Sequence, residues 1–162
     1  MSFKVLAWML LPLLSLACGR KAIHEGKSVA ELQEMLEEAD PEVQAQAAFG
    51  LSQFRADAEP AIPALIRALS SPDPRVRQNA GLALGKIGPA AGPAVPVLVT
   101  ALADPEWAVR RQAVVALGQI GPPLAEVETA LQRCEQDPSS VVRKAARETR
   151  AALRGEATPE LP

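Results

Sequence analysis

A repeat of constant length runs through nearly the whole of this chain. Valine recurs at one fixed interval, with an alanine four positions after each valine, in the pairs Val43 and Ala47, Val76 and Ala80, Val109 and Ala113, Val142 and Ala146. Leucine recurs at the same interval at Leu32, Leu65, Leu98 and Leu131. A fixed period of this size is typical of a solenoid, in which each unit buries its apolar face only against its neighbours. Solenoids act mainly by presenting a surface, so the repeat favours a binding function.

The composition agrees with closely packed helices. Of the 162 residues, 48% are hydrophobic but only 3% are aromatic, so the core has to consist of alanine, leucine and valine. Small aliphatic side chains suit close helix–helix packing better than a large ligand cavity. The net charge of −2 gives no reason to expect a nucleic-acid partner. One histidine and two cysteines do not support a zinc site or a disulfide framework.

The beginning of the chain, up to Cys18, is of a different kind. A lysine is followed by an uncharged apolar run over residues 5–16, which is shorter than the ~20 residues that a membrane-spanning helix needs. This pattern predicts a secretory signal peptide over residues 1–17. The ending Leu-Ser-Leu-Ala-Cys resembles a bacterial lipoprotein lipobox, with Cys18 as the lipid-modified first residue of the mature chain, although Ser15 stands where leucine is usual. An ordinary signal peptide, an uncleaved anchor and a cytosolic protein are the alternatives.

Residues 28–154 divide into four units, each with a first helix (A helix) and a second helix (B helix). The units are predicted at about 28–57, 58–88, 89–121 and 122–154, with A helices at 28–39, 60–70, 93–103 and 123–136 and B helices at 41–54, 74–87, 106–120 and 139–154. Apolar residues of each B helix fall within one arc of roughly 100°, which predicts a single buried stripe. Residues 18–27 are expected to form a tether, and residues 155–162 a disordered tail.

Two segments resemble a known family. DPRVRQNAGLALGKIG (73–88) and DPEWAVRRQAVVALGQIG (104–121) are similar to HEAT repeats of the phycobilisome-lyase type. The resemblance covers about residues 28–154 and implies an all-α, right-handed α-solenoid of four HEAT-like helix pairs. It says little about activity, because this repeat serves many roles. Charged residues in the first A helix and the last B helix indicate that four units are the whole array, since terminal repeats have polar outer faces.

The resemblance also suggests where chemistry would have to lie. His24-Glu25 is similar to the His-Glu pairs that bind iron in HEAT-type deoxyhypusine hydroxylases, but those enzymes need several pairs that face one another, and this chain has one. We therefore expect His24 to be solvated and unstructured, and we expect no catalytic residue, metal or cofactor. Cys134 lies at the A-helix position of Met35 and Ala68, which predicts a small buried residue rather than a catalytic thiol.

An arginine follows the valine in the last three units. Arg77, Arg110 and Arg143 therefore lie along one ridge of the predicted solenoid. In HEAT proteins this arginine typically pairs with an aspartate of the preceding turn, the position that Asp104 and Asp137 hold. The resemblance thus implies a structural ladder of partly exposed pairs that contribute ~0–1 kcal/mol each. A basic ridge that binds a ligand is the alternative.

The outward positions of the B helices form the predicted binding face. Two residues after each valine come Ala45, Gln78, Arg111 and Lys144, and nine after it come Ser52, Gly85, Gly118 and Ala151. These small residues either let a partner approach the backbone or fill places where helices crowd. Phe49, Leu82 and Val115, six after the valine, are expected to pack between repeats. Trp107 is a candidate anchor for a partner, with packing over its turn as the alternative.

The two ends of the repeat region carry opposite charges. Residues 28–55 hold six acidic groups and one arginine, a net charge of −5, whereas residues 139–154 carry a net charge of +4. We expect the last B helix, through Lys144, Arg147 and Arg150, to contact an acidic partner or anionic headgroups. The alternative is that each end is only made soluble by its charges.

These features together predict a non-enzymatic scaffold or adaptor that binds another protein. Lipid on Cys18 would anchor it to a membrane of the bacterial cell envelope, facing the periplasm or the cell surface. An accessory subunit of a lyase-type or other enzyme, by analogy with phycobilisome lyases, and a structural part of a larger envelope complex are the alternatives.

Overall fold

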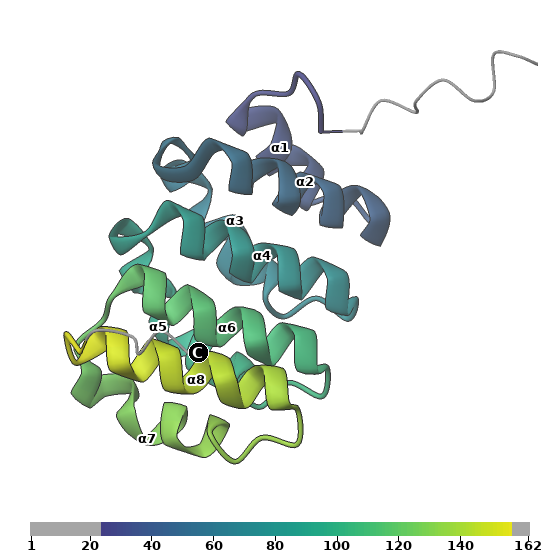
Figure 1. The fold of residues 1–162 in the computed structure, drawn as a ribbon. Coiled ribbons are helices and arrows are strands. Elements are labelled where there is room, and N and C mark those ends of the chain that lie inside the picture. Colours follow the sequence, from purple (N-terminus) through teal and green to yellow (C-terminus); the bar gives the residue numbers. More distant parts are fainter. Residues whose placement is uncertain (1–23, 157–162) are drawn as a thin grey trace, which may run out of the picture.

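The computed structural model describes residues 24–156, which form helix pairs stacked side by side (Figure 1). The A helices are α1 (Val29–Leu36), α3 (Ile62–Ala68), α5 (Val95–Ala101) and α7 (Leu124–Cys134). The B helices are α2 (Pro41–Phe54), α4 (Pro74–Ile87), α6 (Trp107–Ile120) and α8 (Ser140–Leu153). The predicted fold class, an all-α right-handed solenoid, is confirmed. The predicted signal peptide, Cys18 and residues 157–162 of the predicted tail lie outside the described residues.

Residues typical of helix ends lie at the beginning of α2 and α4 and at the end of α4 and α6. The carboxylates of Asp40 and Asp73 accept from the backbone N–H two residues later, at 2.9 and 2.8 Å, with a proline at the first helical position. Gly88 and Gly121 follow α4 and α6 with φ of 83° and 71°. Arg55 holds the same repeat position after α2 and also has a positive φ, of 52°. A side chain there is strained, because this region favours glycine.

All four A helices are shorter than predicted, and two of them also begin differently. α3 and α5 are each preceded by a 3₁₀ helix, η2 (Arg55–Ala61) and η3 (Pro89–Ala94), and the α-helical parts are shorter than expected. Pro60 and Pro93 lie inside these segments. Proline lacks an N–H and disfavours the α conformation at the residue before it, so the chain makes tighter turns until the α helix can begin.

The core runs continuously between the two layers of helices. The four repeated leucines, Leu32, Leu65, Leu98 and Leu131, are all fully buried at 0% exposure. Neighbouring B helices pack side by side, and Figure 1 shows α2, α4, α6 and α8 as one layer. The face of this layer that points away from the A helices is therefore a broad surface built by four helices. Within residues 24–156, no helix has the length and hydrophobicity needed to cross a membrane.

Candidate protein-interaction surface

Each B helix exposes one stripe of side chains on this outer face. The stripe consists of the residues two, six and ten positions after the repeated valine, which are four apart and so lie on one side of a helix. Ala45, at the first of these positions in α2, is buried and does not contribute. These exposed stripes are Phe49 and Gln53 on α2, Gln78, Leu82 and Lys86 on α4, Arg111, Val115 and Gln119 on α6, and Lys144, Glu148 and Ala152 on α8. Because the helices lie side by side, the stripes join into one surface across the layer.

The centre of this surface is apolar. Phe49 is 39% exposed, and Leu82 and Val115 are half-buried in the same row. We expected these three side chains to pack between repeats, and the expectation is wrong for Phe49, whose ring faces outward. The edge of the ring is contacted by His24 and the rest stays at the surface. An apolar row flanked by polar groups is typical of a protein-binding site.

The cations beside the apolar row have few partners. Within residues 24–156, no carboxylate forms an ion pair with Lys86 or Arg111. Lys144 has only a long contact of 3.8 Å with Glu148, and both side chains are more than half exposed. The stripes of α2, α4 and α6 contain no acidic residue. The surface therefore offers positive charge around an apolar centre, which suits a partner that has acidic groups around apolar side chains.

The small residues nine positions after the valine do not face outward. A Cβ atom on Gly85 would lie 3.0 Å from Cα of Ala116, and one on Gly118 would lie 3.2 Å from Cγ2 of Thr149. Ser52 is also buried. Gly85 and Gly118 lie where neighbouring B helices cross, so helix crowding explains these two glycines and the partner-approach interpretation is wrong for them. The prediction that Ala45, two after its valine, faces outward is wrong as well, because this side chain is buried.

The arginine ridge forms a ladder, but its pairs run in the opposite direction from the expected one. Arg77 donates through Nε and Nη2 to Asp104 at 2.7 and 2.8 Å, and Arg110 donates in the same way to Asp137 at 2.7 and 2.9 Å. Each aspartate belongs to the following unit, not to the turn before the arginine's own helix. The arginine contacts its own turn through backbone oxygens, because Nη1 of Arg110 donates to the carbonyl of Asp104 at 2.8 Å.

These ladder pairs are largely shielded from water. The side chains of Arg110 and Asp137 are 15% and 6% exposed. The hydrogen bonds from Arg110 lower the pKa of Asp137, and the backbone N–H of Ser139 contributes to the same shift. The ladder thus links consecutive units, and Arg77 and Arg110 are committed to it rather than open to a ligand.

Arg150 is not part of an open basic surface. It occupies the repeat position of Leu117 and Leu84, which are fully buried, and its side chain is only 12% exposed. Its guanidinium binds Glu128 and Glu135 of α7. Arg154 joins Glu128 at 2.8 Å, and these bonds lower the pKa of Glu128 to about 2. The expectation that Arg150 faces a partner is therefore wrong, whereas Arg147 and Lys144 are exposed.

Trp107 lies apart from the exposed stripes, at the start of α6. Its side chain is 47% exposed and borders a hollow of about 340 Å³ together with Val141, which is 45% exposed. Pro105, Pro138 and Arg110 also line this hollow. The structure thus exposes Trp107 at the A–B turn edge, about two helical turns away from Val115 along α6.

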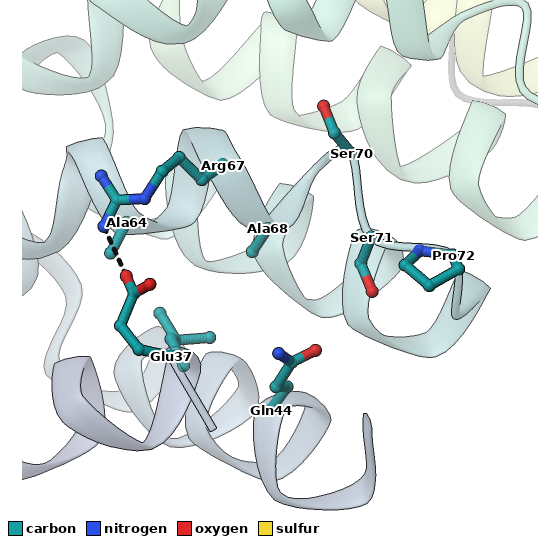
Figure 2. A pocket seen from close by; sticks show the side chains of 9 residues that line it. Glu37, Gln44, Ala64, Arg67, Ala68, Ser70, Ser71 and Pro72 are labelled. Atoms are coloured by element: carbon teal, nitrogen blue, oxygen red, sulfur yellow. Dashed lines mark hydrogen bonds and ion pairs between the residues drawn. The ribbon is translucent and has the colours of Figure 1, made fainter. Parts of the chain in front are cut away.

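Two further hollows lie on the turns between A and B helices. Figure 2 shows one of about 230 Å³, with the ion pair of Glu37 and Arg67 on one side and Gln44 on the other. A second, of about 180 Å³, is bordered by Cys134, whose thiol is buried as predicted for a packing residue. Burial raises the pKa of Cys134 to about 11, so the group remains a thiol at neutral pH.

His24 is placed differently from the expectation that it is unstructured. Its ring packs edge-on against Phe49, with 5.3 Å between the ring centroids, and a Cβ atom on Gly50 would lie only 2.8 Å from Cβ of His24. The residue thus covers the end of the core at α2. Within residues 24–156, no three side chains of His, Cys, Asp or Glu lie close enough together to hold a metal ion. An iron site built from facing His-Glu pairs does not fit these residues.

Comparisons with known proteins agree with this geometry. Residues 29–95 and 90–151 match the family model of HEAT repeats. Human deoxyhypusine hydroxylase in complex with glycerol is similar at 32% identity and a TM-score of 0.62, over 82% of this chain and 45% of that one. The complex of CpcE and CpcF of phycocyanin lyase from Nostoc sp. PCC7120 is similar at 23% identity and a TM-score of 0.55, over 85% of this chain and 70% of that one.

A designed armadillo repeat protein in complex with the peptide (KR)4 is also similar, at 21% identity and a TM-score of 0.68. The alignment covers 77% of this chain and 64% of the designed one. The likenesses to the designed protein and to the Nostoc complex concern the fold alone. The chain spans less than two thirds of the designed protein and less than half of the human enzyme. No functionally curated protein matches the chain.

Proposed function

The chain belongs to the HEAT repeat family, and we propose that it is a membrane-anchored scaffold or adaptor whose exposed stripes bind another protein. The observation that carries this proposal is the apolar row of Phe49, Leu82 and Val115, which lies across the layer of B helices. Beside it lie the cations Lys86 and Arg111, which form no ion pair with any residue of the described range 24–156. A surface of this kind binds through apolar contacts at the centre and is oriented by charge at the rim.

Photo-crosslinking in native cell envelopes tests the surface. A photoreactive residue at Val115 should capture a partner, whereas one at Thr129, exposed on α7, should not. The captured protein is identified by mass spectrometry, purified, and bound to the purified chain. Lys86→Glu and Arg111→Glu should slow association and flatten its salt dependence. Arg133→Glu on α7 is the charge-matched control, and equal effects from all three variants would contradict the proposal.

The anchor rests on the sequence of residues 1–18. The apolar run that ends in Ala17 and Cys18 supports cleavage before Cys18 and attachment of lipid to its thiol. This lipid would hold the solenoid at a membrane of the bacterial envelope. Mass spectrometry of the native protein should find a lipid-modified Cys18 at the new N-terminus. An unmodified Cys18 thiol or an intact Met1 would contradict the anchor and leave the binding surface unaffected.

An accessory role in an enzyme is the second candidate. The likeness to the human hydroxylase favours it, since the two chains share 32% identity over this fold. His24 is the only histidine of the chain and packs against Phe49, so such a role would need catalytic groups from another chain. Activity that appears only when the captured partner is present would support this role.

A further inference from the structure

Arg143 holds the place in α8 that Arg77 and Arg110 hold in the two preceding B helices. Its Nη1 donates to the carbonyl oxygens of Asp137 and Pro138 at 2.7 and 2.9 Å. The corresponding bonds of Arg110, to Asp104 and Pro105, are 2.8 and 3.1 Å. The guanidinium of Arg143 is therefore held by its own turn in the same way as the two ladder arginines.

The other edge of the Arg143 guanidinium, formed by Nε and Nη2, differs from the same edge in Arg77 and Arg110. In Arg77 and Arg110, Nε and Nη2 grip a carboxylate of the following unit. Within residues 24–156, no group accepts a hydrogen bond from Nε or Nη2 of Arg143. Because Nη1 is already bound, the side chain loses little further freedom when a carboxylate arrives, which favours bidentate binding. The pairs of Arg77 with Asp104 and of Arg110 with Asp137 show that Nε and Nη2 in this position bind a carboxylate.

The surroundings of Arg143 are positive. Lys144 and Arg147 are exposed beside it on α8, and Arg147 has no ion pair with any described residue. Arg150 and Arg154, by contrast, are neutralised by glutamates of α7. The excess positive charge of this end is thus concentrated around Arg143.

The matching carboxylate lies at the other end of the molecule. Glu38 holds the repeat position of Asp104 and Asp137, two and three units earlier in the chain. Its turn is built alike, because Nε2 of Gln44 donates to the carbonyl of Glu38 at 2.6 Å. The side chain of Glu38 is exposed and has no partner among the described residues, whereas the adjacent Glu37 binds Arg67.

We propose that Arg143 binds the carboxylate of Glu38 from a second copy of this chain, so that the basic end of one solenoid meets the acidic end of the next. The positive charge of Arg143, Lys144 and Arg147 at one end, and the carboxylates of Glu38 and the nearby Glu34 at the other, favour this head-to-tail contact. The turn over residues 37–40 is exposed, and His24 covers α2 at Phe49 and Gly50, away from that turn. The contact joins turns between A and B helices, whereas the proposed partner site is centred on Phe49, Leu82 and Val115 of the exposed stripes.

Charge reversal tests the contact in the full chain. Sedimentation equilibrium in a density-matched nonionic detergent compares the unmodified chain with Arg143→Glu, Glu38→Arg and the double variant. All four versions share residues 1–23, so association through that segment contributes equally. Either single change should weaken association about tenfold, because a charge-assisted pair is replaced by like charges. The double variant should recover most of the loss. A head-to-tail contact that does not close into a ring lets further copies add to each end. The average mass of the assemblies should therefore rise steadily with protein concentration.

Three controls keep the outcome decisive. Lys86→Glu makes the same charge change on α4 and should leave the association unchanged, and circular dichroism should show equal helix content in every version. Deletion of residues 157–162, which contain Glu160, should also have no effect. Association that appears only after this deletion would show that the chain's own tail occupies Arg143, and would overturn the proposal. A monomer at ~1 mM, or a double variant that associates no better than the single ones, would overturn it as well.

Discussion

Replacement of Asp137 with asparagine removes one carboxylate from the arginine–aspartate ladder. The side chain of Asp137 is 6% exposed and accepts from Nε and Nη2 of Arg110 at 2.7 and 2.9 Å and from the N–H of Ser139 at 2.8 Å. Asparagine keeps an oxygen for Ser139. It removes the negative charge and places an NH₂ group near the donors of Arg110, so the bidentate pair between the third and fourth units is lost.

The expected cost follows from this geometry. A hydrogen bond to a charged group contributes ~1.5–3 kcal/mol, and loss of one partner from a buried pair costs ~3–5 kcal/mol. Arg110 keeps its two carbonyl acceptors and is 15% exposed, so water compensates in part. We therefore expect Asp137→Asn to lower the free energy of unfolding by about 2–3 kcal/mol, measured by urea denaturation with circular dichroism. Glu42→Gln breaks a half-exposed pair with Arg75 and should cost clearly less, because water and salt screen exposed charges.

The same substitution should reduce the sensitivity of the fold to acid. Arg110 holds the pKa of Asp137 below its usual value. The stabilisation is therefore complete above the pKa of an aspartate in the unfolded chain, ~3.9, and is lost as the pH falls through the lower pKa of the folded state. Below about pH 5 the unmodified chain should lose more stability than Asp137→Asn. Two results together would refute the reasoning. Asp137→Asn would lower the free energy of unfolding no more than Glu42→Gln does, and the unmodified chain and Asp137→Asn would lose stability equally in acid.

Three further outcomes are expected. Leu98→Ala should lower the free energy of unfolding by ~2–5 kcal/mol because Leu98 is fully buried, whereas Lys144→Ala should change it by no more than ~0.5 kcal/mol; equal effects in urea melts would contradict the assignment of faces. Arg55→Gly should raise the thermal midpoint, since glycine relieves ~1–2 kcal/mol of strain at a positive φ, and Gly88→Ala should lower it. Cys134, with a pKa of about 11, should react with iodoacetamide at neutral pH far more slowly in the folded protein than in urea; equal rates would contradict its burial.

The sequence by itself determined the helical unit and its buried stripe. The valine, alanine and leucine positions repeat at one constant interval, and a residue's depth in a solenoid depends mainly on its place within the unit. The periodicity therefore specifies that Leu98 lies in the core and that Gln78, Arg111 and Lys144 lie on one outward row. The bounds of the B helices were also predicted to within one residue, because Asp-Pro and Gly-Pro signals act locally on the backbone.

The tertiary structure alone decided how one unit lies against the next. Asp104 and Asp137 each lie within reach of two arginines by sequence, and only the offset between consecutive helices shows that Arg110 binds Asp137. The short distance between α4 and α6 where they cross likewise brings Gly85 against Ala116, so this glycine is not open to a partner. Arg150 turns inward because glutamates of α7 replace the apolar side chains of earlier units. Periodicity specifies an angle around one helix axis, whereas these contacts depend on the distance and rotation between two axes, which are set by how all the side chains pack.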